Sequence, residues 1–270
     1  MGGSADTVAV RPLDAAAVTS PRASAAGSGG NAWLRGAKLL AAILLLPACL
    51  GFTQGFSAHF LHLGAKVRVQ MLGWPVEVQW LGWGILAFTI FAALLWRPLM
   101  PYLFAHELVH ALATWLCLGR VSNLRVSATG GQVTTSKSNT FIRLAPYFIP
   151  LYTLLAAGIF LALDAWWRPL GDYRWILAGV LGFTLAYHVA YTVWSLRRDQ
   201  PDLRPDGWLF SIVVIYLGNL AVIAAVLGLT LSGSARGCGE HVAGVAALGW
   251  EQSGLVYREL YAMLERWLQK

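Results

Sequence analysis

Six apolar stretches recur along this 270-residue chain and limit what it can fold into. An apolar stretch of about 20 residues crosses the hydrocarbon core of a bilayer as a helix. Charged residues make up only 12% of the chain, against about 25% in a soluble domain. We therefore expect an all-α polytopic protein with about six transmembrane helices, integral to a bacterial-type cell membrane. The stretches are residues 39–52, 80–96, 101–118, 142–163, 175–196 and 208–231.

The segments around these stretches divide the chain into three parts. Residues 1–31 are rich in Ala, Ser and Gly without an apolar period, so we expect a disordered N-terminal tail. Residues 32–232 form the predicted transmembrane domain, and its first helix should stay uncleaved because the region before it is too long for a signal peptide. Residues 233–270 end in an amphipathic tail, which we expect on the membrane surface. The net charge of +7 fits cations that face lipid headgroups, and no basic cluster indicates a nucleic-acid partner.

The third apolar stretch contains the motif H-E-x-x-H at residues 106–110. On a helix, His106 and His110 lie on the same face, so both imidazoles can bind one metal ion. Glu107 lies beside that ion, where the glutamate of a zinc hydrolase takes a proton from water and passes it to the leaving amine. A chance pair of histidines bonded between helices is the alternative. Because ionisable residues are costly inside a membrane and usually mark a function there, the motif predicts a zinc site.

Two segments near this helix show the alternation of β-strands. Residues 56–79 contain short alternating runs, which predict a hairpin at the membrane interface. In that segment, His59 and His62 could form a second metal site, or they are ordinary loop histidines. Residues 120–128 alternate like a strand, and residues 129–135 follow with a Gly-Gly pair. Two alternating runs around this pair predict a short β-hairpin directly after the motif helix.

The motif helix, a Gly-Arg-Val phrase at 119–121, the Gly-Gly segment and a helix that opens Arg-Leu-Ala-Pro at 143–146 together resemble the site-2 protease family of intramembrane zinc metalloproteases and its shorter relatives. The resemblance implies that residues 32–232 form a metallopeptidase-like domain. It also implies that a β segment near the site, here Gly130, Gly131 and the residues up to Thr135, pairs with the unwound substrate. Unwinding frees backbone groups that need new partners. A hairpin that only caps helix ends is the alternative.

The family takes its third zinc ligand from an aspartate at the start of a later membrane helix, often in a Leu-Asp-Gly phrase. Asp206, in Pro-Asp-Gly, is the closest literal match. Asp202, in Gln-Pro-Asp, resembles the acidic position of some shorter relatives. The Asn-Pro phrase that precedes this aspartate in the family is absent, so both aspartates stay open as ligands. Either could instead cap the next helix or lie at headgroup level.

His188 is a further candidate because it lies level with the motif. At 1.5 Å per residue, His110 and His188 both lie about 12 Å from the same membrane side. His188 could be the third ligand, could stabilise the tetrahedral intermediate, or could simply bond to a neighbouring helix. Two histidines alone rarely hold catalytic zinc, so a third protein ligand is required.

These residues predict an intramembrane zinc metallopeptidase that hydrolyses a peptide bond in or next to the membrane. Zn²⁺ is the expected cofactor, Glu107 the general base, and a membrane protein or peptide within the lipid bilayer the expected substrate. A rival from another class is a non-catalytic membrane protein, a transporter or an assembly factor, that uses the buried His, Glu and Asp as a metal or proton pathway. A third alternative is a degenerate protease that binds substrates without cutting them.

Overall fold

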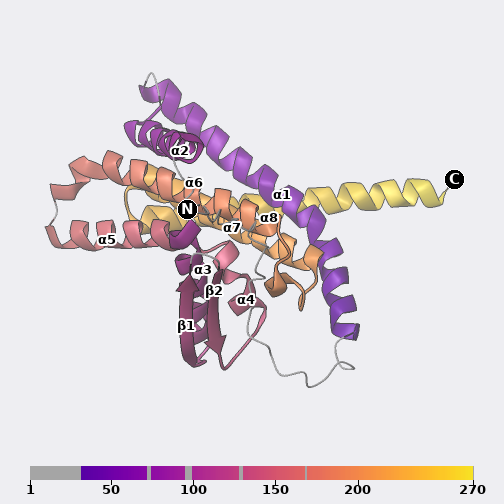
Figure 1. Cartoon of the computed structure of the whole chain (residues 1–270). Coiled ribbons are helices and arrows are strands. Elements are labelled where there is room, and N and C mark those ends of the chain that lie inside the picture. Colours follow the sequence, from indigo (N-terminus) through magenta and orange to yellow (C-terminus); the bar gives the residue numbers. More distant parts are fainter. Residues whose placement is uncertain (1–31, 72–73, 95–98, 128–129, 168, 270) are drawn as a thin grey trace, which may run out of the picture.

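The computed structural model describes residues 32–71, 74–94, 99–127, 130–167 and 169–269. The predicted tail over residues 1–31 lies outside this part of the chain. Most described residues are helical, and two short strands form a small sheet (Figure 1). The elements are α1 (Ala32–Met71), α2 (Val76–Leu94), α3 (Leu99–Leu116), β1 (Val121–Ser127), β2 (Gly130–Thr135), α4 (Thr140–Leu144), α5 (Leu151–Trp167), α6 (Arg174–Leu196), α7 (Trp208–Ser232) and α8 (Ala235–Leu268).

Among the described residues, four helical segments are long and apolar enough to cross a membrane, namely the first 32 residues of α1, α2, α7, and α6 with the turn before it (Leu170–Leu196). A fifth span results if α4 and α5 count as one, and the two are bent by 81°. Proline lies at the bend, as Pro146 and Pro150 in the sequence predict. The motif helix α3 is not among the four, because its three ionisable residues lower its hydropathy. The helical architecture with a hairpin after α3 is confirmed, but the count of about six spans is not.

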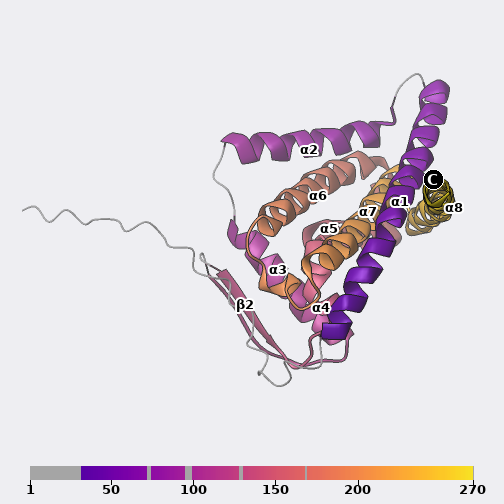
Figure 2. The ribbon, with the colours of Figure 1, turned by 90° about the vertical axis from the view of Figure 1, so that its right-hand side faces the viewer.

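Glycines allow two pairs of helices to pack with their backbones almost in contact. In α1, a Cβ on Gly55 would lie 2.3 Å from the backbone nitrogen of Gly249 in α8. In α2, a Cβ on Gly84 would lie 2.0 Å from the backbone oxygen of Gly179 in α6. Small residues at such crossings are how helices associate closely in a membrane, where no hydrophobic force drives them together. Figure 2 shows α1 beside α8 and α2 beside α6, with α7 between the two pairs.

The first helix is longer than the sequence predicts. α1 continues to Met71 as a helix, so the hairpin predicted over residues 56–79 is wrong. Short alternating runs are weak strand signals, and here the segment packs on α8, which the local pattern does not reveal. His59 forms a 3.0 Å hydrogen bond with His241 of α8, so its histidine partner comes from another helix and not from His62.

The last helix, α8, begins at Ala235, just after the boundary predicted at residue 233, but it is not separate from the helix bundle. The first part of α8 belongs to the bundle, since Ser253 is buried and its hydroxyl lies 3.4 Å from the carbonyl oxygen of Ala48 in α1. Beyond that point the helix extends past the others, and Trp267 is 72% exposed (Figure 1). The predicted amphipathic tail is therefore the exposed end of a bundle helix, and its location on a membrane surface stays a prediction.

The hairpin and α4 together enclose one side of α3. β1 and β2 pair antiparallel, with Leu124 opposite Val133, and they project away from the helices (Figure 1). Val133 is buried. The side chain of Asn139 caps α4 by accepting a hydrogen bond from the Ile142 nitrogen at 2.8 Å. Ile142 then packs with Val109 of α3 in one apolar cluster, which fixes the face of α3 that carries the motif.

Candidate metal centre

All three motif residues of α3 are buried. His106, Glu107 and His110 are 7%, 5% and 8% exposed. The two imidazoles are neighbours, with ring centroids 4.9 Å apart, as the spacing of four residues predicts. Buried polar groups need partners or a ligand, so the groups around them decide what the site can hold.

Asp202 completes a group of three potential metal ligands. It lies in the 3-10 helix Pro201–Leu203 between α6 and α7. Its Oδ2 atom is 3.4 Å from Nε2 of His110 and 3.6 Å from Nε2 of His106, and the three ligand atoms lie within 4.8 Å of one another. Ligand atoms about 2.0–2.1 Å from a tetrahedral zinc ion are about 3.3 Å apart. The group could therefore hold a metal ion, and the two distances from Asp202 to the histidines are close to this spacing.

Hydrogen bonds prepare two of these ligands for a cation. Nδ1 of His110 lies 2.7 Å from the carbonyl oxygen of Ile142. A carbonyl only accepts, so Nδ1 carries the hydrogen and Nε2 keeps its lone pair towards Asp202. The Tyr147 hydroxyl donates to Oδ2 of Asp202 at 3.1 Å. Burial raises the pKa of Asp202, but its two histidine neighbours lower it by more, so the net shift is below the usual value.

Glu107 lies against the hairpin and beside the three ligands. A Cβ on Gly131 of β2 would lie only 2.4 Å from Cγ of Glu107, whereas the Cβ position of Gly130 has open space. The Glu107 carboxylate also interacts electrostatically with His110 and Asp202. Glu107 is therefore a buried neighbour of the ligand group without being one of its members.

Asp206 does not belong to the ligand group, although its phrase is the closest match to the family pattern. Its buried carboxylate accepts hydrogen bonds from Arg143 at 2.7 to 2.9 Å and from the Thr140 hydroxyl at 2.8 Å. It also forms an ion pair with Lys38 of α1. Burial alone would raise the pKa of Asp206, but Lys38, Arg143 and Thr140 hold it below its usual value. Asp206 lies four residues after Asp202, and its side chain contacts α1 and α4 instead of the histidines. The hypothesis that Asp206 is a metal ligand is therefore corrected.

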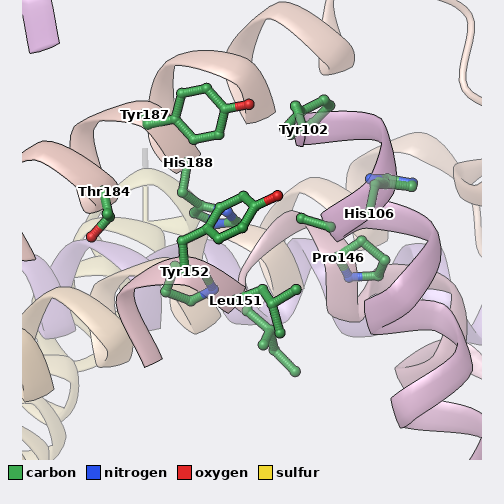
Figure 3. Close-up of a pocket in the computed structure, with 11 residues that line it drawn as sticks. Tyr102, His106, Pro146, Leu151, Tyr152, Thr184, Tyr187 and His188 are labelled. Carbon is green, nitrogen blue, oxygen red and sulfur yellow. The ribbon is translucent and has the colours of Figure 1, made fainter. Parts of the chain in front are cut away.

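His188 lies on α6 and shares a small cavity with His106 of α3 (Figure 3). The shared cavity agrees with the membrane depth of about 12 Å, estimated from the helical rise per residue, which predicts that His188 is level with the motif. His188 is outside the three-ligand group. Its Nε2 atom is buried and has no hydrogen-bond partner among the described residues.

The sequence did not single out three residues that support this site. Tyr147 packs its ring edge-on against His106, with centroids 5.1 Å apart, and bonds to Asp202. Its one signal is its position directly after the Arg-Leu-Ala-Pro phrase. Arg143 lies within that phrase, and nothing nearby in the sequence identifies Asp206 as its partner. Lys38 flanks the first apolar stretch, and its partner Asp206 is 168 residues away.

The fold and the site define a mainly helical protein, compatible with a membrane protein, that contains a candidate metal-binding group. No protein-family model, curated protein or solved structure matches the chain. Which metal and which reaction the site serves must therefore follow from the chemistry of its residues.

Proposed function

We propose that the chain is a zinc metallopeptidase that hydrolyses a peptide bond in or next to a membrane. The approach of Asp202 to His106 and His110, beside the buried Glu107, is the observation that carries this proposal. Two imidazoles and one carboxylate are a donor set of catalytic zinc sites, which keep a fourth position open. Mg²⁺ and Ca²⁺ prefer oxygen ligands alone, so two imidazoles argue against them.

Each residue of the site has a part in the proposed reaction. Zinc in the site supplies a Lewis acid that acidifies water and polarises the scissile carbonyl. Glu107 accepts the proton of the attacking water and returns it to the leaving amine. The contact with Gly131 restricts the Glu107 side chain, and the Ile142 carbonyl fixes the ring of His110. The residues around the site thus hold the base and the ligands in one orientation.

The hairpin supports the proposal that the substrate binds as an extended segment. β1 occupies one edge of β2, and the backbone groups along the other edge can pair with a further strand. Because β2 touches Glu107 at Gly131, a peptide paired with that edge lies close to the base. A membrane-embedded substrate must be unwound before its peptide bonds can be attacked, and a strand edge provides partners for the freed backbone groups.

The metal content of the detergent-purified protein is the first test. We expect about one zinc ion per chain by elemental mass spectrometry. The zinc should be lost in His106→Ala and Asp202→Ala and retained in Asp206→Asn. A wild-type protein that contains no zinc after purification without chelators, and takes none up when it is added, contradicts the proposal.

Glu107→Gln separates a peptidase from a metal pathway. The variant should keep its zinc but cleave a model transmembrane peptide about 10²–10⁴-fold more slowly, because the general base is lost. Glu251→Gln, at an exposed position of α8, is the matched control and should cleave normally. A transporter or an assembly factor would instead show no cleavage by the wild type, and Glu107→Gln would change metal affinity or ion movement.

A further inference from the structure

We propose that one ordered water molecule is bound between α3 and α6 and links His106 to His188. The inference rests on the proposed function, because it requires that Nε2 of His106 binds the metal. It concerns the side of the His106 ring that faces away from Asp202, and it gives a role to the buried His188.

Two buried nitrogen atoms without protein partners belong to residues that line the same cavity. Nδ1 of His106 and Nε2 of His188 both lack a hydrogen-bond partner among the described residues. Each of the two residues is only 7% exposed. Figure 3 shows them on facing helices around the cavity, together with Tyr102. Buried polar atoms in native proteins nearly always have a partner, so an unseen group is expected here.

The two nitrogens are complementary as donor and acceptor. With Nε2 of His106 on the metal, Nδ1 of the neutral ring carries the hydrogen and donates. His188 hydrogen-bonds to the backbone of Tyr147. Because Nε2 of His188 has no partner, Nδ1 must donate to that carbonyl, which leaves Nε2 as an acceptor. A group between the two rings must accept one hydrogen bond and donate another, and water does both.

The size and the walls of the cavity fit a single water molecule. The cavity leaves about 10 Å³ for the centre of a water-sized sphere, and a buried water needs roughly 10–15 Å³ by this measure together with two to four polar partners. The hydroxyl of Tyr102, which also lines the cavity, offers a third partner. Ala105, Pro146 and Leu151 form apolar parts of the wall.

The water makes His188 a positioning residue for the metal site. A ligating histidine normally donates its second ring N–H to a carboxylate, a backbone carbonyl or a water. The carbonyl of Ile142 serves His110 in this way at 2.7 Å, but no described protein group serves His106. The water held by His188 gives His106 the acceptor that the Ile142 carbonyl gives His110. It therefore fixes both the orientation and the tautomer of the His106 ring.

Zinc affinity tests the bridge. The full chain in detergent is titrated with zinc against a chromogenic chelator, as wild type, His188→Leu and His188→Gln. Leucine removes the acceptor, and we expect the zinc dissociation constant to rise about 10–100-fold. Glutamine keeps an acceptor oxygen at similar reach and should restore most of the affinity. Tyr152→Phe is the control in the same cavity and should bind zinc normally, because its hydroxyl donates to the Pro101 carbonyl instead.

The outcomes separate this inference from the proposed function. Equal zinc affinity for wild type and His188→Leu, both folded by size exclusion and tryptophan fluorescence, overturns the water bridge and leaves the peptidase proposal standing. A wild type that binds no zinc overturns both. A zinc-loaded structure that resolves ordered waters gives the direct check. We expect density between Nδ1 of His106 and Nε2 of His188, and an empty cavity or a direct bond between the rings refutes the bridge.

Discussion

Asp202→Asn and Asp206→Asn should have opposite effects on zinc binding and on stability. Asp202 is one of three potential ligands in the candidate group, and an amide is a poor zinc ligand. We therefore expect its loss to weaken zinc binding by more than the 10–100-fold that an outer-shell partner contributes. Asp206 touches no proposed ligand, so its variant should bind zinc when folded. Its effect should appear in the free energy of unfolding.

The size of the Asp206 effect follows from the burial of its ion pairs. The Asp206 side chain is 0% exposed, while Lys38 and Arg143 are 18% and 17% exposed. Removing one partner of a buried ion pair destabilises a protein by about 3–5 kcal/mol, because the remaining charge is left unpaired. Both cations keep some contact with water, and an asparagine oxygen still accepts from Thr140. We therefore expect the lower end of that range, about 3 kcal/mol.

Both quantities can be measured on the same detergent-purified samples. Zinc affinity comes from competition with a chelator, and the free energy of unfolding comes from tryptophan fluorescence during titration with SDS. Asp199→Asn is the matched control in the same loop, since Asp199 and its partner Arg204 are 73% and 68% exposed, and such surface pairs contribute about 0–1 kcal/mol. If folded Asp206→Asn loses zinc while Asp202→Asn keeps it, the assignment of the two aspartates is refuted.

Three further predictions follow from close contacts and from charge. Gly131→Ala should keep zinc but lose most peptidase activity in a cleavage assay, because the new Cβ displaces the motif glutamate, whereas Gly130→Ala has open space and should stay active. Gly55→Ala should separate α1 from α8 and lower the melting temperature, whereas Gly36→Ala, with nothing within 4 Å of its Cβ, should not. The pKa of Asp206 is lowered in the folded state, so its contribution to stability is complete above the unfolded value of about 3.9 and disappears as the pH falls through the folded value. The difference in melting temperature between wild type and Asp206→Asn should therefore be constant near neutral pH and shrink below about pH 4.

Local signals were sufficient for the motif helix, the bend and the hairpin. His106 and His110 face one way because four residues make about one helical turn. Pro146 and Pro150 remove backbone donors within a few residues, so the helix breaks between α4 and α5. The alternation around the Gly-Gly pair predicts β1 and β2, which pair antiparallel with Ser127 opposite Gly130. Each of these features depends on residues that are close in the sequence.

Features that depend on distant partners could not be predicted in the same way. The segment 56–79 contains short strand-like runs, but α1 continues through it, and His59 of this helix bonds to His241 of α8. The end of α8 has the composition of a surface helix, yet Ser253 lies buried against α1. No local pattern identifies these partners, so tertiary packing overrode the local preference.

The two aspartates of the 202–206 loop show why the third ligand needed the structure. Both follow prolines and both precede a predicted membrane helix, so the local sequence does not show which of them is the ligand. What separates them is the charge of their distant neighbours. Asp206 forms ion pairs with two cations, Lys38 and Arg143. They compensate its negative charge, so it does not need a metal ion as a partner. Asp202 meets two imidazoles and a hydroxyl, none of which carries a fixed positive charge, so its negative charge remains available. The loop is thus held at one aspartate by ion pairs with α1 and α4, and this anchoring keeps the other aspartate, four residues earlier, within reach of α3.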